Sequence, residues 1–306
     1  MHTGASSEWR ARVFGLRASK MADVMAKPFG TVAIIGVGLI GGSIGLALRR
    51  RGLADRVVGI GRRQSSLRAA RRIGAVDTTT IDISRGVADA DLVIVCTPVD
   101  RIVEHVRQAA AGCREGTLIS DVGSTKQQLV EMLDGGLPRG CRFLGAHPLA
   151  GGEKSGPGHA DAELFEGRVA IVTPTKNTRA EDYDRIEGFW QALGSVVIRM
   201  PPEEHDRALA MTSHLPHVAA AALAASVPET LFRLTGSGMH DATRVAAGDP
   251  ALWKHILLQN RFNVLAALEH FRTRLAAVHV ALRSGDGDAL EQLLITAKKN
   301  RDAMGN

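Results

Sequence analysis

One histidine of this chain has the setting of a catalytic base. His147 follows the apolar stretch 142–146 and opens residues 147–156, which read HPLAGGEKSG. An imidazole titrates near neutral pH and can therefore accept a proton from a substrate. A lone histidine is more often structural, but the glycines, Glu153 and Lys154 around this one favour a functional role. We interpret His147 as a general base and Glu153 as a candidate substrate contact.

A glycine-rich turn supplies a binding signal. The apolar stretch 31–36 runs into GVGLIG, a GxGxxG pattern at the start of a helical stretch. In this pattern the first glycine permits a tight turn, the second lets backbone approach a pyrophosphate, and the third allows close packing of the helix. The phosphates then lie on N–H groups of the helix N-terminus; a glycine-rich turn without a ligand is the alternative. The predicted cofactor contacts are Gly36, Gly38, Leu39, Ile40 and Gly41.

Two arginines stand where the adenosine ribose of a dinucleotide is usually bound. An NAD site commonly places Asp or Glu there, at the end of the second strand. Here the sequence reads GIGRR, with Arg62 and Arg63 in that place. Guanidinium groups can hold a 2′-phosphate bidentately, which favours NADP over NAD. The alternative is that both arginines form a solvated face.

Two further apolar stretches end in polar residues, where open parallel sheets bind their ligands. The stretch 91–96 continues into Thr97 and Pro98, which we expect beside the nicotinamide ribose. Its last residue, Cys96, is interpreted as a small buried side chain and not as a nucleophile. The stretch 117–121 leads to Ser124, which fits a helix N-cap as well as it fits a functional role.

The C-terminal half places histidines within an alanine-rich helical stretch. Residues 213–217 read SHLPH, and Pro216 leaves a backbone carbonyl without its helical partner. The polar members Ser213, His214 and His217 could form a pocket wall or a polar cluster in the core. The His-x-x-His spacing resembles half a metal site, but no carboxylate-rich motif accompanies it, so we predict no metal.

A second polar group follows at 238–253. Asp241 fits a helix N-cap, and Arg244, one turn later, could hold a substrate carboxylate. Trp253 is interpreted as a packing anchor at the start of the next helix.

Composition and charge narrow the classes of function. The 306 residues are 45% hydrophobic and 23% charged, which fits a globular protein of one large or two ordinary domains. Only 12 aromatic residues argue against binding of single-stranded nucleic acid by stacking. The net charge of +6 arises mainly from nine arginines against one aspartate over 49–72. Such a segment could bind nucleic acid or a small anion; we favour the anion and predict no nucleic-acid partner.

Three scattered cysteines provide no disulfide framework, which favours the reducing cytoplasm. Residues 1–29 lack the apolar core of a secretory signal; we expect a disordered extension, with a transit peptide as the alternative. Residues 31–48 are uncharged and long enough to span a membrane, but five glycines divide them. They fit a strand, a turn and a helix better, so we predict no membrane partner.

The elements that position these residues alternate along the chain. Strands are predicted at 31–36, 56–60, 91–96, 117–121, 142–146, 168–173 and 195–200. Helices are predicted at 39–51, 64–73, 99–111, 124–133 and 180–193. Near-continuous Val/Ile runs separated by helices indicate a doubly wound, parallel α/β sheet of the Rossmann type over 30–200.

The pattern changes after Pro201-Pro202. Apolar residues then recur at helical spacing, with no clear strand. Helices are predicted at 203–226, 228–235, 241–247, 250–283 and 286–303. The sequence therefore predicts an all-helical second domain over 201–303.

Taken together, these motifs resemble the prephenate/arogenate dehydrogenase family of tyrosine biosynthesis. The matching stretches are GVGLIGGS (36–43), DVGSTK (121–126), HPLAGGEKSG (147–156), SHLPH (213–217), DATR (241–244) and DPALW (249–253). They follow the family's order over nearly the whole chain, and HPLAGGEKSG is the most specific of them.

The resemblance implies an NAD(P)-dependent oxidative decarboxylation of prephenate or arogenate. The ring carbon that bears the hydroxyl gives up hydride, the ring carboxylate leaves as CO₂, and the ring becomes aromatic. His147 matches the family's catalytic base, Ser124 the serine that orients it, Arg244 the arginine that binds substrate carboxylate, and Asp241 a residue of the same segment. Ser213, His214 and His217 match the pocket segment of the helical domain. That domain forms the family's dimer interface, which implies a homodimer.

Two departures from the family pattern bear on specificity. NAD-specific members carry an acidic residue where Gly61-Arg62-Arg63 stands, and some prephenate-preferring members have lysine at the place of His240. The choice between prephenate and arogenate stays open. Alternatives are another two-domain dehydrogenase, of the 3-hydroxy acid or imine reductase type, and a dinucleotide sensor without catalysis.

Overall fold

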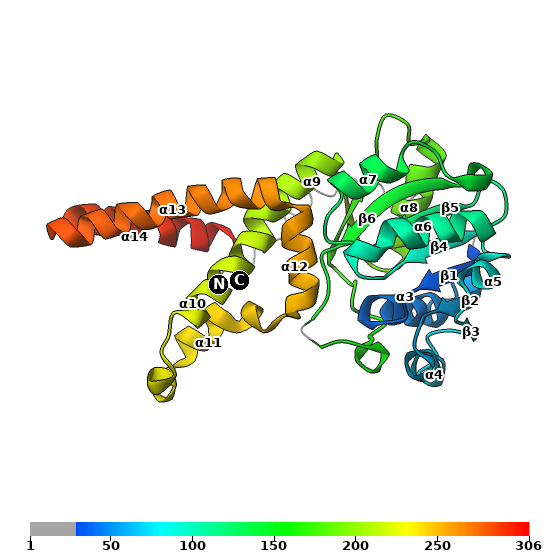
Figure 1. The fold of residues 1–306 in the computed structure, drawn as a ribbon, viewed down its shortest axis with the longest axis horizontal. Helices are drawn as coiled ribbons and strands as arrows, with labels where there is room; N and C mark the ends of the chain where they lie inside the picture. The colour runs from blue at the N-terminus through cyan, green and yellow to red at the C-terminus, as the bar shows by residue number, and fades with distance from the viewer. Residues whose placement is uncertain (1–28, 153, 306) are drawn as a thin grey trace, which may run out of the picture. The chain divides into compact units, whose positions relative to one another are not determined.

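Eight strands form a single sheet. The computed structural model describes residues 29–152 and 154–305, and the strand order is β3-β2-β1-β4-β5-β6-β7-β8 (Figure 1). The strands are β1 (Phe29–Ile35), β2 (Ala54–Ile60), β3 (Thr78–Thr80), β4 (Leu92–Val95), β5 (Leu118–Asp121), β6 (Arg142–Pro148), β7 (Val169–Thr173) and β8 (Val196–Arg199). Neighbouring strands are parallel except β6 and β7, which are antiparallel. The predicted α/β fold is confirmed, with this one antiparallel pair as a correction.

The seven predicted strands differ from the observed ones by at most two residues at either end. β3 was not predicted, because its three threonines form no apolar run. It pairs only with β2 at the edge of the sheet and is half-buried, so an apolar run is not required at this position.

The helices that flank the sheet are α3 (Leu39–Arg50), α4 (Gln64–Arg72), α5 (Ile83–Val87), α6 (Ile102–Gly112), α7 (Gln127–Leu133) and α8 (Ala180–Ala192). The short α5 was not predicted, and α7 begins three residues after the predicted start at 124. Short 3₁₀ turns lie at Val99–Arg101, Pro138–Gly140 and Pro157–His159.

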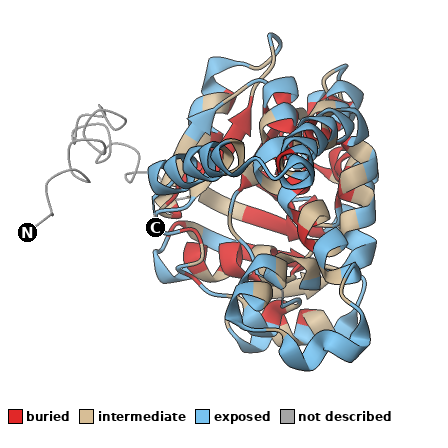
Figure 2. Ribbon diagram, turned by 90° about the vertical axis from the view of Figure 1, so that its left-hand side faces the viewer, coloured by how far each residue is buried: buried red, intermediate tan, exposed pale blue. Residues whose placement is uncertain are grey.

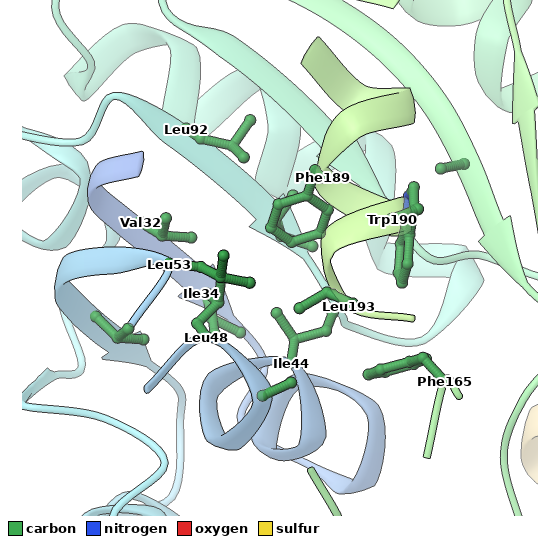
Figure 3. Packing of buried hydrophobic residues seen from close by; sticks show 14 of the residues in the cluster. Val32, Ile34, Ile44, Leu48, Leu53, Leu92, Phe165, Phe189, Trp190 and Leu193 are labelled. Carbon is green, nitrogen blue, oxygen red and sulfur yellow. The ribbon is translucent and has the colours of Figure 1, made fainter. Parts of the chain in front are cut away.

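Both faces of the central strands are buried. On one face, Val32 and Ile34 of β1 belong to a core cluster with Ile44 of α3 and Phe189 of α8 (Figure 3). Between them in sequence, Ala33 points to the opposite face and is also fully buried, because successive side chains of a strand alternate. Buried residues accordingly follow the strands, and exposed ones the outer sides of the helices (Figure 2). This double burial explains the continuous apolar runs of the sequence.

The chain divides into two compact units. We call the described residues up to His205, with Asp249–His255, the sheet unit, and Asp206–Gly248 with the described residues from Ile256 onward the helical unit. The first boundary falls inside a helix, between His205 and Asp206 of α9 (Pro202–Leu209).

After β8 the described residues up to 305 contain helices and no strand. Following α9 come a π-helical turn (Ala210–His214), α10 (Leu215–Ala225), 3₁₀ turns (Glu229–Leu234 and Arg244–Ala247), α11 (Ser237–Thr243), α12 (Pro250–Gln259), α13 (Arg261–Ser284) and α14 (Gly287–Ala303). Three predictions need correction. The helix at 228–235 is a 3₁₀ turn, α11 begins at Ser237 and not at 241, and Asn260 divides the long helix 250–283.

One stretch, Pro202–Ala225, is long and apolar enough to cross a membrane by length and composition alone. A third of its apolar window is buried within the structure, and the core helix of a globular protein passes the same test. Residues 31–48, whose length raised the same question, instead form β1 and α3 with the glycine turn between them.

Candidate active site

Four parallel strands carry predicted site residues to one edge of the sheet. β1, β4, β5 and β6 are neighbours in that order, so their carboxyl ends lie at the same edge. Gly36 follows β1, Thr97 follows β4, Ser124 follows β5, and His147 lies at the end of β6. The chain leaves β1 toward β2 on one side and resumes at β4 on the other, which is the switch point where open α/β sheets bind ligands.

The glycine turn after β1 packs tightly against the end of β4. Gly36 has a φ of +100°, a left-handed conformation that favours glycine. A Cβ atom there would lie 2.6 Å from the carbonyl oxygen of Cys96. A Cβ atom at Gly41 would clash with the carbonyl oxygen of Gly36. Both glycines are therefore required by the fold itself.

Gly38 lies in open space at the N-terminus of α3. A Cβ atom added to it would have no described atom within 4 Å. In the part of the chain that the structure describes, no side chain caps this end of α3, and no acidic residue lies in its first turn. Open space and uncapped N–H groups at a helix N-terminus suit a phosphate. The turn therefore fits the pyrophosphate of a dinucleotide cofactor.

The segment that follows His147 folds back over α3. The hydroxyl of Ser43 in α3 accepts a hydrogen bond of 2.9 Å from the backbone N–H of Asp161. A Cβ atom on Gly42 would lie 2.9 Å from the Cβ of Ala160, so α3 and this segment approach closely because glycine lacks a side chain. Cβ atoms added to Gly151 and Gly152 would lie 4.0 Å from Cδ1 of Ile40 and 3.9 Å from Cδ2 of Leu39, so the HPLAGGEKSG segment lies beside the first residues of α3. Glu153, the predicted substrate contact of this segment, lies outside the described residues.

His147 is the second-last residue of β6 and is half-buried. β6 continues two residues beyond the predicted end, and His147 pairs with Ile171 across antiparallel β7. Its Nδ1 atom lies 2.8 Å from Nε2 of His205, and the two ring centroids are 5.1 Å apart. His205 belongs to α9 and is fully buried. No local pattern in the sequence singles out His205, because it stands 58 residues from its partner.

A buried ion pair supports the residues that lead to Ser124 and His147. The Asp121 carboxylate accepts hydrogen bonds from Lys126 Nζ at 2.5 Å, from the Gly123 N–H at 2.7 Å and from the Ala146 N–H at 3.2 Å. The side chains of Asp121 and Lys126 are both fully buried. Ser124 lies inside this turn and is half-buried. The N-cap alternative for Ser124 is wrong, because α7 begins at Gln127 and Lys126 occupies its N-cap position.

Thr97 and Pro98 follow β4 as predicted from the sequence. The Thr97 hydroxyl lies 3.0 Å from Nδ1 of His105, and Pro98 is exposed. Burial lowers the pKa of His105, and the nearby positive charges of Arg101 and Arg62 act in the same direction. Burial raises the pKa of the Cys96 thiol well above its ordinary value, which agrees with an unreactive cysteine.

Arg62 and Arg63 are exposed and lie between β2 and α4. Within residues 29–152 and 154–305, neither guanidinium has an ion pair. The positive charge of Arg62 is among the groups that lower the pKa of His105, whose Nδ1 atom lies 3.0 Å from the Thr97 hydroxyl. Both guanidiniums are therefore available to an anion at this end of the sheet.

The predicted residues of the helical unit form two groups that are close to each other. Ser213 and His214 lie in the π-helical turn, and His217 lies in α10. His214 is buried, with Nδ1 3.0 Å from Nδ2 of Asn260. Burial lowers the pKa of His217, partly offset by a hydrogen bond to the backbone of Val245.

Asp241 and Arg244 are both exposed and belong to the second group. Asp241 is not an N-cap, because α11 begins at Ser237 and Gly236 occupies its N-cap position. Arg244 opens the 3₁₀ turn that contains Val245 and contacts α10. In the described part of the chain, no group of three or more His, Cys, Asp or Glu side chains is arranged to hold a metal ion.

Comparison with known proteins identifies relatives over both halves of the chain. The family model for the prephenate dehydrogenase nucleotide-binding domain matches residues 44–199, and that for the prephenate dehydrogenase dimerization domain matches residues 201–296. Prephenate dehydrogenase of Bacillus subtilis is 34% identical over 90% of this chain and 76% of its own length. Cyclohexadienyl dehydrogenase of Zymomonas mobilis is 36% identical over 90% of this chain and 96% of its own length.

A solved structure extends this likeness to three dimensions. The prephenate dehydrogenase of Aquifex aeolicus, in complex with hydroxyphenyl propionate and NAD⁺, has a TM-score of 0.85 and 34% sequence identity. The match covers 91% of this chain and 99% of that one. Both domain models, the curated relatives and the solved structure indicate the same family. The chain therefore belongs to the prephenate dehydrogenase family.

Proposed function

We propose that this oxidoreductase of the prephenate/arogenate dehydrogenase type uses His147 as its general base. The observation that carries the proposal is the position of His147 at the carboxyl end of β6, on the same sheet edge as the glycine turn. A bound nicotinamide supplies the hydride acceptor. The imidazole of His147 takes the proton of the ring hydroxyl while the ring carboxylate leaves as CO₂. Formation of an aromatic ring makes that loss strongly favourable.

Ser124 is proposed to orient His147 and the substrate hydroxyl. It follows β5, whose parallel neighbour β6 carries His147. The hydrogen bonds of Asp121 to Gly123 and Ala146 hold the residues immediately before Ser124 and His147. A fixed backbone on both sides limits the freedom of the two side chains, which favours proton transfer.

Five residues of the helical unit remain proposed substrate contacts, together with Glu153. Arg244 is the proposed partner of a substrate carboxylate, because a guanidinium binds carboxylates bidentately. The other four are Ser213, His214, His217 and Asp241.

NADP is the proposed cofactor in preference to NAD. Arg62 and Arg63 are exposed at the end of β2, where a dinucleotide commonly presents its adenosine ribose. Two guanidiniums favour a 2′-phosphate over the neutral hydroxyl of NAD. The predicted contacts Thr97 and Pro98 lie at the end of β4, beside the glycine turn.

The helical unit is proposed to form a homodimer. Large apolar side chains on its helices are exposed in the single chain, at 60% or more for Phe262, Leu265, Val280, Leu282 and Leu294. Exposed apolar surface of this kind marks interfaces between proteins. Light scattering should give twice the mass of one chain. We place the enzyme in the cytoplasm and expect neither nucleic acid nor a membrane as partner.

The test of the activity is an assay of the purified protein with prephenate and with arogenate, each against NAD and NADP. Absorbance of the reduced cofactor reports hydride transfer, and CO₂ release reports decarboxylation. We expect both signals in equal amounts for at least one substrate, with NADP preferred. Absence of turnover with all four combinations would contradict the proposal, as would hydride transfer without CO₂.

A further inference from the structure

We infer that His205 is a positioning residue that holds His147 in the protonation state required of a base. The inference rests on the proposed role of His147. Its structural basis is the distance of 2.8 Å between Nδ1 of His147 and Nε2 of His205. The two histidines come from different elements, β6 and α9, and both belong to the sheet unit.

The direction of this hydrogen bond decides whether His147 can act as a base. Two neutral imidazoles can form the bond in either direction, because each ring carries one N–H and one bare nitrogen. If His205 donated from Nε2, His147 would carry its own proton on Nε2 and could not accept another there. If His147 donates from Nδ1, its Nε2 keeps a lone pair. Only the second arrangement leaves a base at Nε2, and it requires His205 to present a bare Nε2.

The accepting arrangement requires a neutral His205, whose side chain is fully buried. In an imidazolium both ring nitrogens would be donors, and neither could accept the proton of His147. A neutral His205 with its own proton on Nδ1 can accept the Nδ1–H of His147. When His147 becomes an imidazolium during turnover, the same bond becomes charge-assisted and stronger.

An imidazole differs from a carboxylate as a partner in this position. A carboxylate beside His147 would favour its charged form and raise its pKa, which reduces the fraction of free base at neutral pH. Among the described residues, the Asp121 carboxylate at this edge bonds to Lys126 and to two backbone N–H groups. A neutral acceptor fixes the ring of His147 without adding negative charge.

The first test substitutes the acceptor. His205→Leu removes it, and we expect kcat to fall about 10- to 100-fold, the range found when a hydrogen-bond partner that orients a metal-bound histidine is lost. The KM for substrate should change by less than about threefold, because binding contacts remain. His205→Gln can present its amide oxygen to Nδ1 and should recover most of kcat. His159→Gln, at an exposed histidine of the sheet unit, is the matched control.

Wild-type kcat in His205→Leu would overturn the inference. So would equal losses of kcat in His205→Leu and His205→Gln when both variants unfold at the wild-type urea concentration.

The second test reads the proton directly and needs no turnover. In protein labelled with ¹⁵N-histidine, the resonances of His147 are assigned by their loss in His147→Asn. We expect a protonated Nδ1 and an unprotonated Nε2 at neutral pH in the wild type. The reverse tautomer would overturn the inference. If His147→Asn retained activity while this tautomer was found, the proposed base would fail and the role of His205 in holding the ring would stand.

Discussion

The Nζ atom of Lys126 lies 2.5 Å from Oδ2 of Asp121, and both side chains are fully buried. Taking two charges out of water is costly, so their mutual attraction and additional hydrogen bonds must offset that cost. Asp121 has such bonds, from the N–H groups of Gly123 and Ala146. The pair therefore joins the end of β5 to the residue that precedes His147.

Breaking this pair from one side should strongly destabilise the protein. Lys126→Met leaves the Asp121 carboxylate buried without its counter-charge, and we expect the free energy of unfolding to fall by about 3–5 kcal/mol. Urea denaturation measures it. The double variant Asp121→Asn with Lys126→Met should lose less than the sum of the two single losses, because no uncompensated charge remains. Additive losses would contradict a direct interaction between the two groups.

Most of the sheet could be predicted because its central strands are buried on both faces. The runs at β1 and β4 are almost entirely apolar for that reason, so the bounds of both strands could be predicted to within two residues. The direction of β7 could not be predicted, since an apolar run has the same composition in a parallel and an antiparallel pair. β3 consists of three threonines at an edge and carries no apolar signal.

Site residues could be predicted where they belong to a local sequence motif, as Gly36 and His147 do. His205 could not, because its role depends on a partner 58 residues away. The capping predictions failed for a similar reason. Ser124 and Asp241 have the right residue type, but the helices near them begin at Gln127 and Ser237. Residue type suggests a cap, while the surrounding packing decides where a helix begins.

Removal of the proposed base should strongly reduce turnover and leave substrate binding intact. His147→Asn cannot accept the hydroxyl proton at neutral pH, so kcat should fall about 100- to 10,000-fold. Ser124→Ala retains the base, so its kcat should fall less than that of His147→Asn. The dissociation constant of a substrate analogue, measured by calorimetry, should stay within about threefold in both variants. A His147→Asn enzyme with near-normal kcat would exclude this residue as the base.

Two glycines of the same turn should respond differently to alanine. Gly36→Ala places a side chain at a φ of +100° and against the Cys96 carbonyl, so the thermal midpoint of unfolding should fall. Gly38→Ala adds a Cβ atom in open space and should unfold like the wild type. If the pyrophosphate approaches Gly38, the same variant should bind the dinucleotide at least about tenfold more weakly, about 1.4 kcal/mol. Unchanged dinucleotide affinity in Gly38→Ala would contradict the cofactor position.

Acidification should destabilise the chain through its buried histidines. Burial lowers the pKa of His217 from its ordinary value of 6.5, so the unfolded state takes up a proton more readily than the folded state. The stability contributed by neutral His217 is complete above pH 6.5 and is lost as the pH falls below it. The free energy of unfolding should therefore decline from pH 7.5 to 5.5 less steeply in His217→Gln than in the wild type. His159→Gln, at an exposed position, should keep the wild-type slope.

Cofactor preference should depend on the two exposed arginines after β2. A hydrogen bond to a charged group contributes about 1.5–3 kcal/mol, so Arg62→Ala or Arg63→Ala should lower kcat/KM for NADP about 10- to 100-fold. The value for NAD should change little, because NAD carries a hydroxyl where NADP carries the phosphate. Arg68→Ala removes an exposed arginine of α4 and controls for the general loss of positive charge. Initial rates with each cofactor at saturating substrate measure the ratio. An unchanged NADP/NAD ratio in the double variant Arg62→Ala with Arg63→Ala would show that neither guanidinium selects the 2′-phosphate.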